Sequence, residues 1–178
     1  NEILYNSIYY IFVGVNPTNT NYKIFYILSY DSSTTFTLKQ SLSHGSKFNI
    51  VHCIYFDKSN NVWLGGYTWN SSLYTCLKCS LSIITDGFSD STIIKNWKYN
   101  NTSFVNREIY SICEDKYGNI CIGGNSVNSN GKIFVVLDKN NNDNILYSIS
   151  QDSSSNYVIK YINNTKTNTL YLGGKFSN

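Results

Sequence analysis

Two stretches of the chain share one pattern of apolar and polar positions. Residues 51–66 read VHCIYFDKSNNVWLGG, and residues 109–124 read IYSICEDKYGNICIGG. Both have two apolar residues three positions apart, then Asp-Lys, then Asn, then alternating apolar residues that end in a Gly pair. Apolar stretches on either side of a turn rich in Asp and Asn are typical of a β-hairpin. The pattern therefore predicts one hairpin in each stretch.

The pattern recurs near both ends of the sequence. Residues 159–174 end in LYLGG, and at the other end Ile3 takes the place of Ile54 while residues 11–14 read IFVG. A repeat of about 50 residues is in the range of propeller blades with four strands each. The Gly residues that close the copies and set this period are Gly14, Gly65, Gly123 and Gly173.

Each Gly pair is followed by a polar loop and two further strand-like stretches. We expect a third strand at residues 23–30, 73–81 and 132–137, and a fourth at residues 36–42, 93–99 and 145–149. The chain should therefore be all-β, part of a single β-propeller domain with four-stranded antiparallel blades. About three and a half blades are expected, at approximately residues 1–48, 49–106, 107–155 and 156–178, the first and last incomplete.

The repeated residues are expected to maintain the blades. An Asp in the turn can accept hydrogen bonds from turn amides, and the Gly pair allows a bulge or a close approach of backbone. Trp63, Trp69 and Trp97 suggest an aromatic shelf, but the position of Trp63 is filled in other copies by Phe12, Cys121 and Tyr171, which indicates packing between blades. The structural repeat motif comprises Asp57, Asn61, Gly65, Gly66, Asp115, Asn119, Gly123, Gly124, Gly173 and Gly174.

The copy at residues 109–124 resembles the two-component-regulator propeller repeat, whose blades read roughly I-x-x-I-x-E-D-x-x-G-x-I-W-I-G-T. Residues 170–176 (LYLGGKF) and 130–133 (NGKI) are similar to delta-60 and kelch-like repeats, in which a Gly pair closes the second strand. The Thr that usually follows the Gly of the regulator repeat is replaced here by Gly66, Gly124 and Gly174. These resemblances imply a propeller and no catalytic residue.

The composition agrees with an all-β fold and bears on the source. The chain has 16 Tyr and 9 Phe, one Pro, no Met and no Ala, and aromatic and β-branched residues favour strands. The excess of Asn, Ile, Lys, Tyr and Phe is typical of an AT-rich genome, such as that of a protist or a giant virus of amoebae. The first residue already lies in a strand-like stretch, so we expect a native N-terminus further upstream.

Charge and hydropathy argue against two classes of partner. The net charge is +3 with 14% charged residues, and the Lys residues are scattered rather than gathered in a basic stripe, so no nucleic-acid partner is expected. No apolar run approaches the roughly 20 residues that a membrane helix needs, so no membrane insertion is expected either.

The cysteines and acidic loops do not form a metal-site pattern. The five Cys are expected to be reduced and partly buried. Cys76 and Cys79 have the spacing of a zinc knuckle but lack a second ligand pair, and on a strand they would point to opposite faces. Residues 138–143 (DKNNND) resemble a calcium loop without its Gly and its final Glu. No metal and no cofactor are therefore expected.

No group of residues resembles a catalytic site. His44 lies in a polar loop, and His52 takes a strand position that Tyr110 and Lys160 fill in other copies. Nucleophile, phosphate-loop and metalloprotease motifs are absent from the sequence. We therefore expect that the protein is not an enzyme.

The interpretation that remains is a non-enzymatic structural or protein-interaction module, with a large assembly such as a virus particle as one setting. The alternative is an extracellular propeller domain that senses a ligand or binds a glycan. The expected partners are other proteins or the remaining blades of the same propeller, with a virion or extracellular location favoured over the cytoplasm. Residues beyond those given are expected to complete a ring of roughly six to eight blades.

Overall fold

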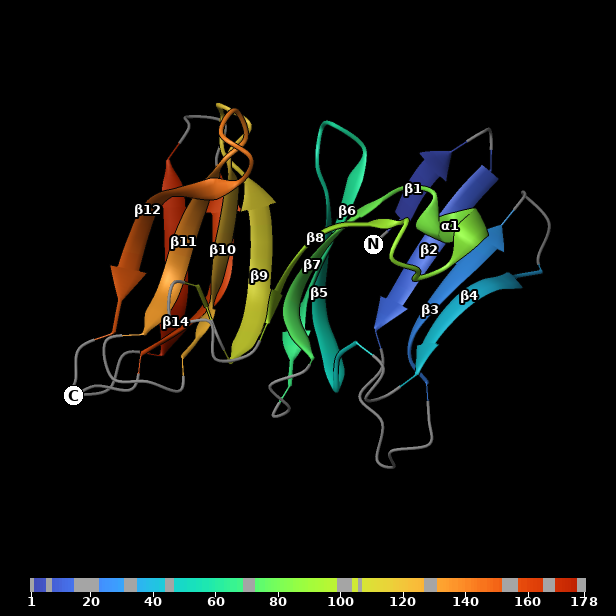
Figure 1. The fold of residues 1–178 in the computed structure, drawn as a ribbon, viewed down its shortest axis with the longest axis horizontal. Coiled ribbons are helices and arrows are strands. Elements are labelled where there is room, and N and C mark those ends of the chain that lie inside the picture. Colours follow the sequence, from blue (N-terminus) through green and yellow to red (C-terminus); the bar gives the residue numbers. More distant parts are fainter. Residues whose placement is uncertain are drawn as a thin grey trace.

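The computed structural model consists almost entirely of antiparallel β-strands (Figure 1). The strands form a four-stranded sheet, an eight-stranded sheet and a two-stranded hairpin, which stand side by side. The structure describes residues 2–5, 8–14, 23–30, 35–43, 47–68, 73–98, 104–105, 107–126, 131–151, 157–164 and 169–175.

Strands follow one another in space in nearly the order of the chain. The four-stranded sheet contains β1 (Glu2–Tyr5), β2 (Ile8–Gly14), β3 (Lys23–Tyr30) and β4 (Thr37–Ser43). The eight-stranded sheet contains β5 (Ile50–Phe56), β6 (Asn61–Tyr67), β7 (Tyr74–Ser80), β8 (Ile93–Lys98), β9 (Glu108–Glu114), β10 (Ile120–Asn125), β11 (Lys132–Asp138) and β12 (Asn144–Ser150). The hairpin contains β13 (Val158–Asn164) and β14 (Leu170–Lys175).

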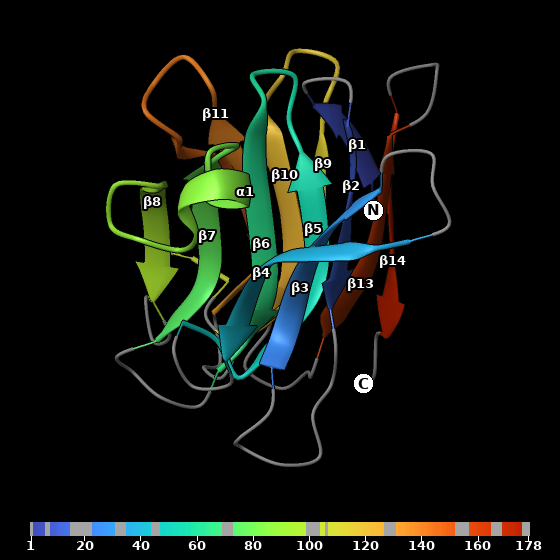
Figure 2. The same ribbon diagram turned by 90° about the vertical axis from the view of Figure 1, so that its right-hand side faces the viewer.

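The eight-stranded sheet consists of two four-stranded blades. Strands β5 to β8 pair in chain order, and so do β9 to β12, whereas β6 and β9 share the single residue pair Tyr67 and Glu108. Figure 2 shows β8, β7, β6 and β5 in that order across one blade. The inner strands of successive blades, β5, β9 and β13, contact one another in turn. The prediction of all-β, four-stranded antiparallel blades is confirmed.

The only helix among the described residues is a single turn that the sequence pattern did not predict. It is α1 (Ile83–Asp86), which lies between β7 and β8 and buries Ile83 and Ile84. No described helix is long and apolar enough to cross a membrane.

The first copy of the repeat pairs differently from the others. Ile3 lies opposite Tyr10, and Tyr5 opposite Ile8. Ile54 instead lies opposite Leu64, in a hairpin whose longer turn is closed by the pair Phe56 and Val62. The prediction that Ile3 takes the structural place of Ile54 was therefore wrong. The first copy has no Asp-Lys pair to hold the longer turn, so its hairpin closes more tightly.

The hydrophobic core lies between blades. Three clusters of buried side chains combine residues of the first and second blades, of the second and third, and of the third blade and the β13–β14 hairpin. Phe12, Trp63 and Cys121, which share one position of the repeat, each belong to a different cluster. Trp63 is fully buried and stacks on Trp97 with ring centroids 5.7 Å apart. The aromatic repeat position thus serves packing between blades, while Trp69 lies outside the described residues.

The first Gly of each pair lies where the next blade packs. A Cβ on Gly123 would approach Cγ2 of Ile159 to 2.5 Å, and a Cβ on Gly65 would clash in the same way with Ile109. Ile109 and Ile159 occupy equivalent positions on the inner strands β9 and β13. At Gly173, by contrast, the described atoms nearest to a Cβ belong to Tyr161, at 3.8 Å or more.

The Asp residues of the repeat hold the hairpin turns. Asp115 Oδ1 accepts hydrogen bonds from the amides of Tyr117 and Asn119, each at 2.8 Å. Asp57 accepts the corresponding bonds from Ser59 and Asn61, each at 2.9 Å. The Asn side chain that ends each turn returns to the same Asp carboxylate, which explains why Asn61 and Asn119 recur.

Alanine at the first Gly of each pair tests the contact between blades. Gly65→Ala and Gly123→Ala should each lower the free energy of unfolding by about 1–3 kcal/mol, because the added methyl group overpacks an isoleucine. Gly173→Ala is the matched control and should change stability by less than about 0.5 kcal/mol. Urea unfolding followed by circular dichroism measures all three, and equal losses would contradict the assignment.

Alanine at the turn Asp residues tests a difference between two otherwise equivalent hairpins. Asp57 Oδ2 also accepts a hydrogen bond from Nε1 of the buried Trp63, at 2.8 Å, whereas Cys121 fills that position in the next blade. Asp57→Ala should therefore cost about 1–3 kcal/mol more than Asp115→Ala, because it leaves a buried N–H without an acceptor. The measurement is again urea unfolding. A larger loss in the free energy of unfolding for Asp115→Ala would show that the hydrogen bond from the Trp63 indole to Asp57 contributes nothing.

Candidate functional site

One β-bulge recurs on the inner strand of three successive units. In each hairpin the two strands shift register by one residue opposite the Gly pair. The extra residue is His52 in β5, Tyr110 in β9 and Lys160 in β13. A bulge leaves its extra residue outside the ladder and redirects the side chain, and bulges are frequent next to functional sites. We call His52, Tyr110 and Lys160 the bulge row.

The second Gly of each pair makes the bulge possible. A Cβ at any of these positions would clash with a carbonyl oxygen of the paired inner strand. The clashing pairs are Gly66 with Ile50, Gly124 with Glu108, and Gly174 with Val158. The Gly pair therefore has two separate roles, since its first residue admits the next blade and its second admits the bulge.

The side chains of the bulge row contact one another across the blades. The rings of His52 and Tyr110 lie 5.0 Å apart at an angle of 31°, and Lys160 Nζ lies 5.8 Å from the centre of the Tyr110 ring. Tyr110 also donates a hydrogen bond from its hydroxyl group to Oε2 of Glu108, at 2.5 Å. Three residues from three inner strands thus form one continuous row centred on Tyr110.

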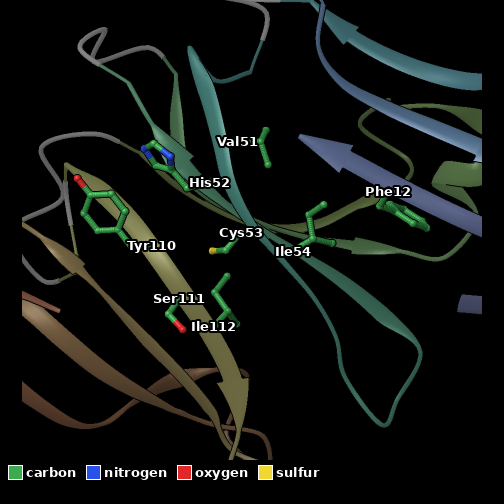
Figure 3. Close-up of a pocket in the computed structure, with 8 residues that line it drawn as sticks. All are labelled: Phe12, Val51, His52, Cys53, Ile54, Tyr110, Ser111 and Ile112. Atoms are coloured by element: carbon green, nitrogen blue, oxygen red, sulfur yellow. The ribbon is translucent and has the colours of Figure 1, made fainter. Parts of the chain in front are cut away.

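A cavity of about 410 Å³ opens between the inner strands β5 and β9 beside this row. Figure 3 shows His52 and Tyr110 close together at one end of the cavity and Phe12 at the other. The residues that line it are Phe12, Val51, His52, Cys53, Ile54, Tyr110, Ser111 and Ile112. Most of the surface exposed to the cavity is polar, although several lining side chains, such as Phe12 and Ile54, are apolar.

The ionisable groups of the cavity are held in their neutral forms. Partial burial lowers the pKa of His52, against a smaller opposing effect of the Glu108 carboxylate. Burial and the hydrogen bond to Glu108 raise the pKa of Tyr110. Burial raises the pKa of Cys53 to about 12, so at neutral pH its thiol is a poor nucleophile. The cavity therefore offers rings and hydrogen-bonding groups suited to binding.

A second cavity, of about 360 Å³, lies between the hairpin turns of the second and third blades. Two ion pairs join the blades there: Lys58 to Glu114 at 3.3 Å, and Lys78 to Asp143 at 2.8 Å. Asp143 is therefore paired with a lysine, and Asp138 Oδ1 accepts a hydrogen bond from the amide of Asn140, so both carboxylates at the ends of the 138–143 loop have partners. The carboxylates of Asp57 and Asp115 accept hydrogen bonds from the backbone amides of these turns, as described above.

The cysteine pair with knuckle spacing is split between two core clusters. Cys79 packs in the cluster between the first and second blades, and Cys76 in the cluster between the second and third. The two thiols therefore face opposite sides of β7. No group of three or more potential metal ligands occurs within the described part of the chain, from which His44 is excluded.

The bulge row was not recognised from the sequence, although its members were aligned. His52, Tyr110 and Lys160 appeared only as three unrelated residues at one position of the repeat. Two signals mark this position: the chemistry changes there while the preceding residue stays apolar, and a Gly that permits a bulge lies opposite in each copy. The motif residues of the turns and Gly pairs position the strands around the first cavity and are not among the residues that line it.

Comparison with known protein families supports propeller repeats in one hairpin of this chain. The family model of the two component regulator propeller matches residues 45–68, which include β5, the turn at Asp57 and β6. No curated protein matches the chain. The matched stretch is the second-blade copy of the pattern, whose equivalent at residues 109–124 carried the resemblance in the sequence. The chain thus contains a hairpin similar to a two-component regulator propeller repeat, within a run of propeller blades.

Proposed function

We propose that this chain is a non-enzymatic propeller module that binds another protein through the bulge row. The carrying observation is the recurrence of one bulge in three inner strands, each presenting a chemically different side chain. The hydrogen bonds and packing that build a blade do not depend on the bulged side chain. The side chain at this position is therefore available for recognition while the hydrogen bonds and packing of the blade stay the same.

The exposure and chemistry of the row suit a protein interface. His52 and Lys160 are exposed and Tyr110 is partly exposed. Aromatic residues are enriched in protein interfaces and supply many of their strongest contacts. The bond from Tyr110 to Glu108 and the tilted ring contact with His52 hold the Tyr110 ring in place, which reduces the entropy lost on binding.

The proposed setting is a larger assembly in which the module is a structural component. The composition is typical of an AT-rich genome such as that of a giant virus, so the particle of such a virus is one candidate for this assembly. The low reactivity of the Cys53 thiol supports binding rather than catalysis at this cavity.

A second candidate function is the recognition of a small ligand or glycan in the same cavity. The match to the regulator propeller at residues 45–68 favours it, and a volume of about 410 Å³ lies within the usual range of ligand pockets. Ligand-observed NMR with an oligosaccharide panel separates the two candidates. Saturable binding that Tyr110→Ala abolishes would favour the small ligand.

The protein-binding proposal is tested by photo-cross-linking followed by affinity measurement. A photoreactive residue at position 160 should capture a defined partner in cells that make the protein, and one at position 117 should not. With the purified partner, Tyr110→Ala should weaken binding about 30-fold or more, the loss expected of an interface hot spot. Isothermal titration calorimetry gives the dissociation constants.

Tyr117→Ala is the matched control, since Tyr117 is 63% exposed and lies in the hairpin turn of the same blade. The dissociation constant of this variant for the partner should stay within about twofold of that of the unmodified chain, because surface contacts outside a hot spot contribute little. Equal weakening by Tyr110→Ala and Tyr117→Ala, with both variants folded by circular dichroism, would refute the bulge row as the binding surface.

A further inference from the structure

Cys113 and Cys121 face each other across the first hairpin of the third blade. They are register partners in the antiparallel pair β9–β10. Directly opposite residues in such a pair have Cα atoms about 4.5–5.5 Å apart, which lies within the roughly 4.4–6.8 Å span of disulfides. The strands therefore bring the two thiols together without any change of backbone.

The two thiols differ in access. Cys121 is fully buried in the cluster between the third blade and the β13–β14 hairpin, where it packs with Ile159 and Ile162. Cys113 is only partly buried and lies at the border of the same cluster. One thiol can thus meet a reagent from solvent, and the other can meet only its neighbour.

The close approach of the two thiols also separates their acidities. It lowers the pKa of Cys113 and raises the pKa of Cys121. In the remaining three cysteines burial raises the pKa, to about 12 for Cys53 and Cys79 and well above the usual value for Cys76. Because the thiolate is the nucleophile, Cys113 is the cysteine best placed to react first.

We propose that Cys113 and Cys121 are a redox-active pair that closes reversibly into a cross-strand disulfide by exchange with a low-molecular-weight disulfide such as oxidised glutathione. This site is independent of the proposed binding function. The same position holds Tyr55 opposite Trp63 in the second blade and Asn163 opposite Tyr171 in the last hairpin. The sulfur pair is therefore particular to the third blade and is not demanded by the repeat.

The exchange proceeds in two displacements. The Cys113 thiolate attacks one sulfur of oxidised glutathione, forms a mixed disulfide and releases one glutathione thiolate. The Cys121 sulfur then attacks the Cys113 sulfur and displaces the second glutathione, and the Cys121 proton passes to the departing glutathione sulfur. The two electrons lost by the cysteines reduce one oxidised glutathione to two glutathione molecules.

Closure would tie β9 to β10 at the point where both contact the next unit. Cys121 shares its cluster with Ile159, which packs against Gly123 on the same hairpin. The redox state of the pair is therefore positioned to alter packing between the third blade and the β13–β14 hairpin.

Mass spectrometry of the intact chain tests the proposal. Reduced protein is equilibrated with glutathione buffers of increasing oxidation, quenched with acid, alkylated and digested with trypsin. The expected product joins the tryptic peptides 108–116 and 117–132 and disappears on return to reducing buffer. Cys113→Ser and Cys121→Ser should both abolish it, and Cys53→Ser, the matched control, should not.

Two further readouts distinguish an exchange site from thiols that merely pack together. In Cys121→Ser, glutathione should accumulate on Cys113, whereas in Cys113→Ser little should reach Cys121. In the unmodified folded chain, iodoacetamide should label Cys113 at least about tenfold faster than Cys53, Cys76 or Cys79, as expected for the more acidic and more accessible thiol. Failure to form the linked peptides in folded protein, or preferential labelling of another cysteine, would overturn the proposal.

Discussion

The contact between an inner-strand isoleucine and a glycine of the preceding blade is the constraint on which the architecture depends. Ile109 packs on Gly65, and Ile159 packs on Gly123. Among the described residues, the backbone pairing between neighbouring blades is limited to β6 and β9, which meet at one residue pair. Apolar packing, together with the two ion pairs between the second and third blades, therefore holds the blades to one another. That packing requires a close approach that any side chain at the glycine would prevent.

The same glycine pair links this packing to the candidate site. Its first residue lets the next blade approach, and its second lets the inner strand bulge. Because the inner strands are in contact, the bulged residues of successive blades come within reach of one another. The tilted contact of the His52 ring with Tyr110 and the approach of Lys160 to the same ring follow from the close packing of the blades and the bulge in each inner strand.

Much of the fold could be predicted from the sequence, because the repeat combines apolar alternation with turn chemistry that acts locally. The strands at residues 50–56, 61–67 and 23–30 follow from these signals, and the Asp57 and Asp115 turns are held as the residue types suggest. The pairing of β1 with β2 could not be predicted, because no Asp fixes that turn. The Gly pairs indicated that a bulge is allowed, but the meeting of His52, Tyr110 and Lys160 depends on contacts between three inner strands that a linear pattern does not display. The sulfur contact of Cys113 with Cys121 was missed for the same reason.

The bulged position also separates the demands of stability from those of recognition. A substitution at His52, Tyr110 or Lys160 leaves the ladder, the turn and the glycine contact in place, because the backbone there is set by Gly66, Gly124 and Gly174. The side chains at these positions can therefore vary with little penalty from folding. With the binding role proposed above, a chain built in this way could change what it binds, one blade at a time, while its framework stays the same.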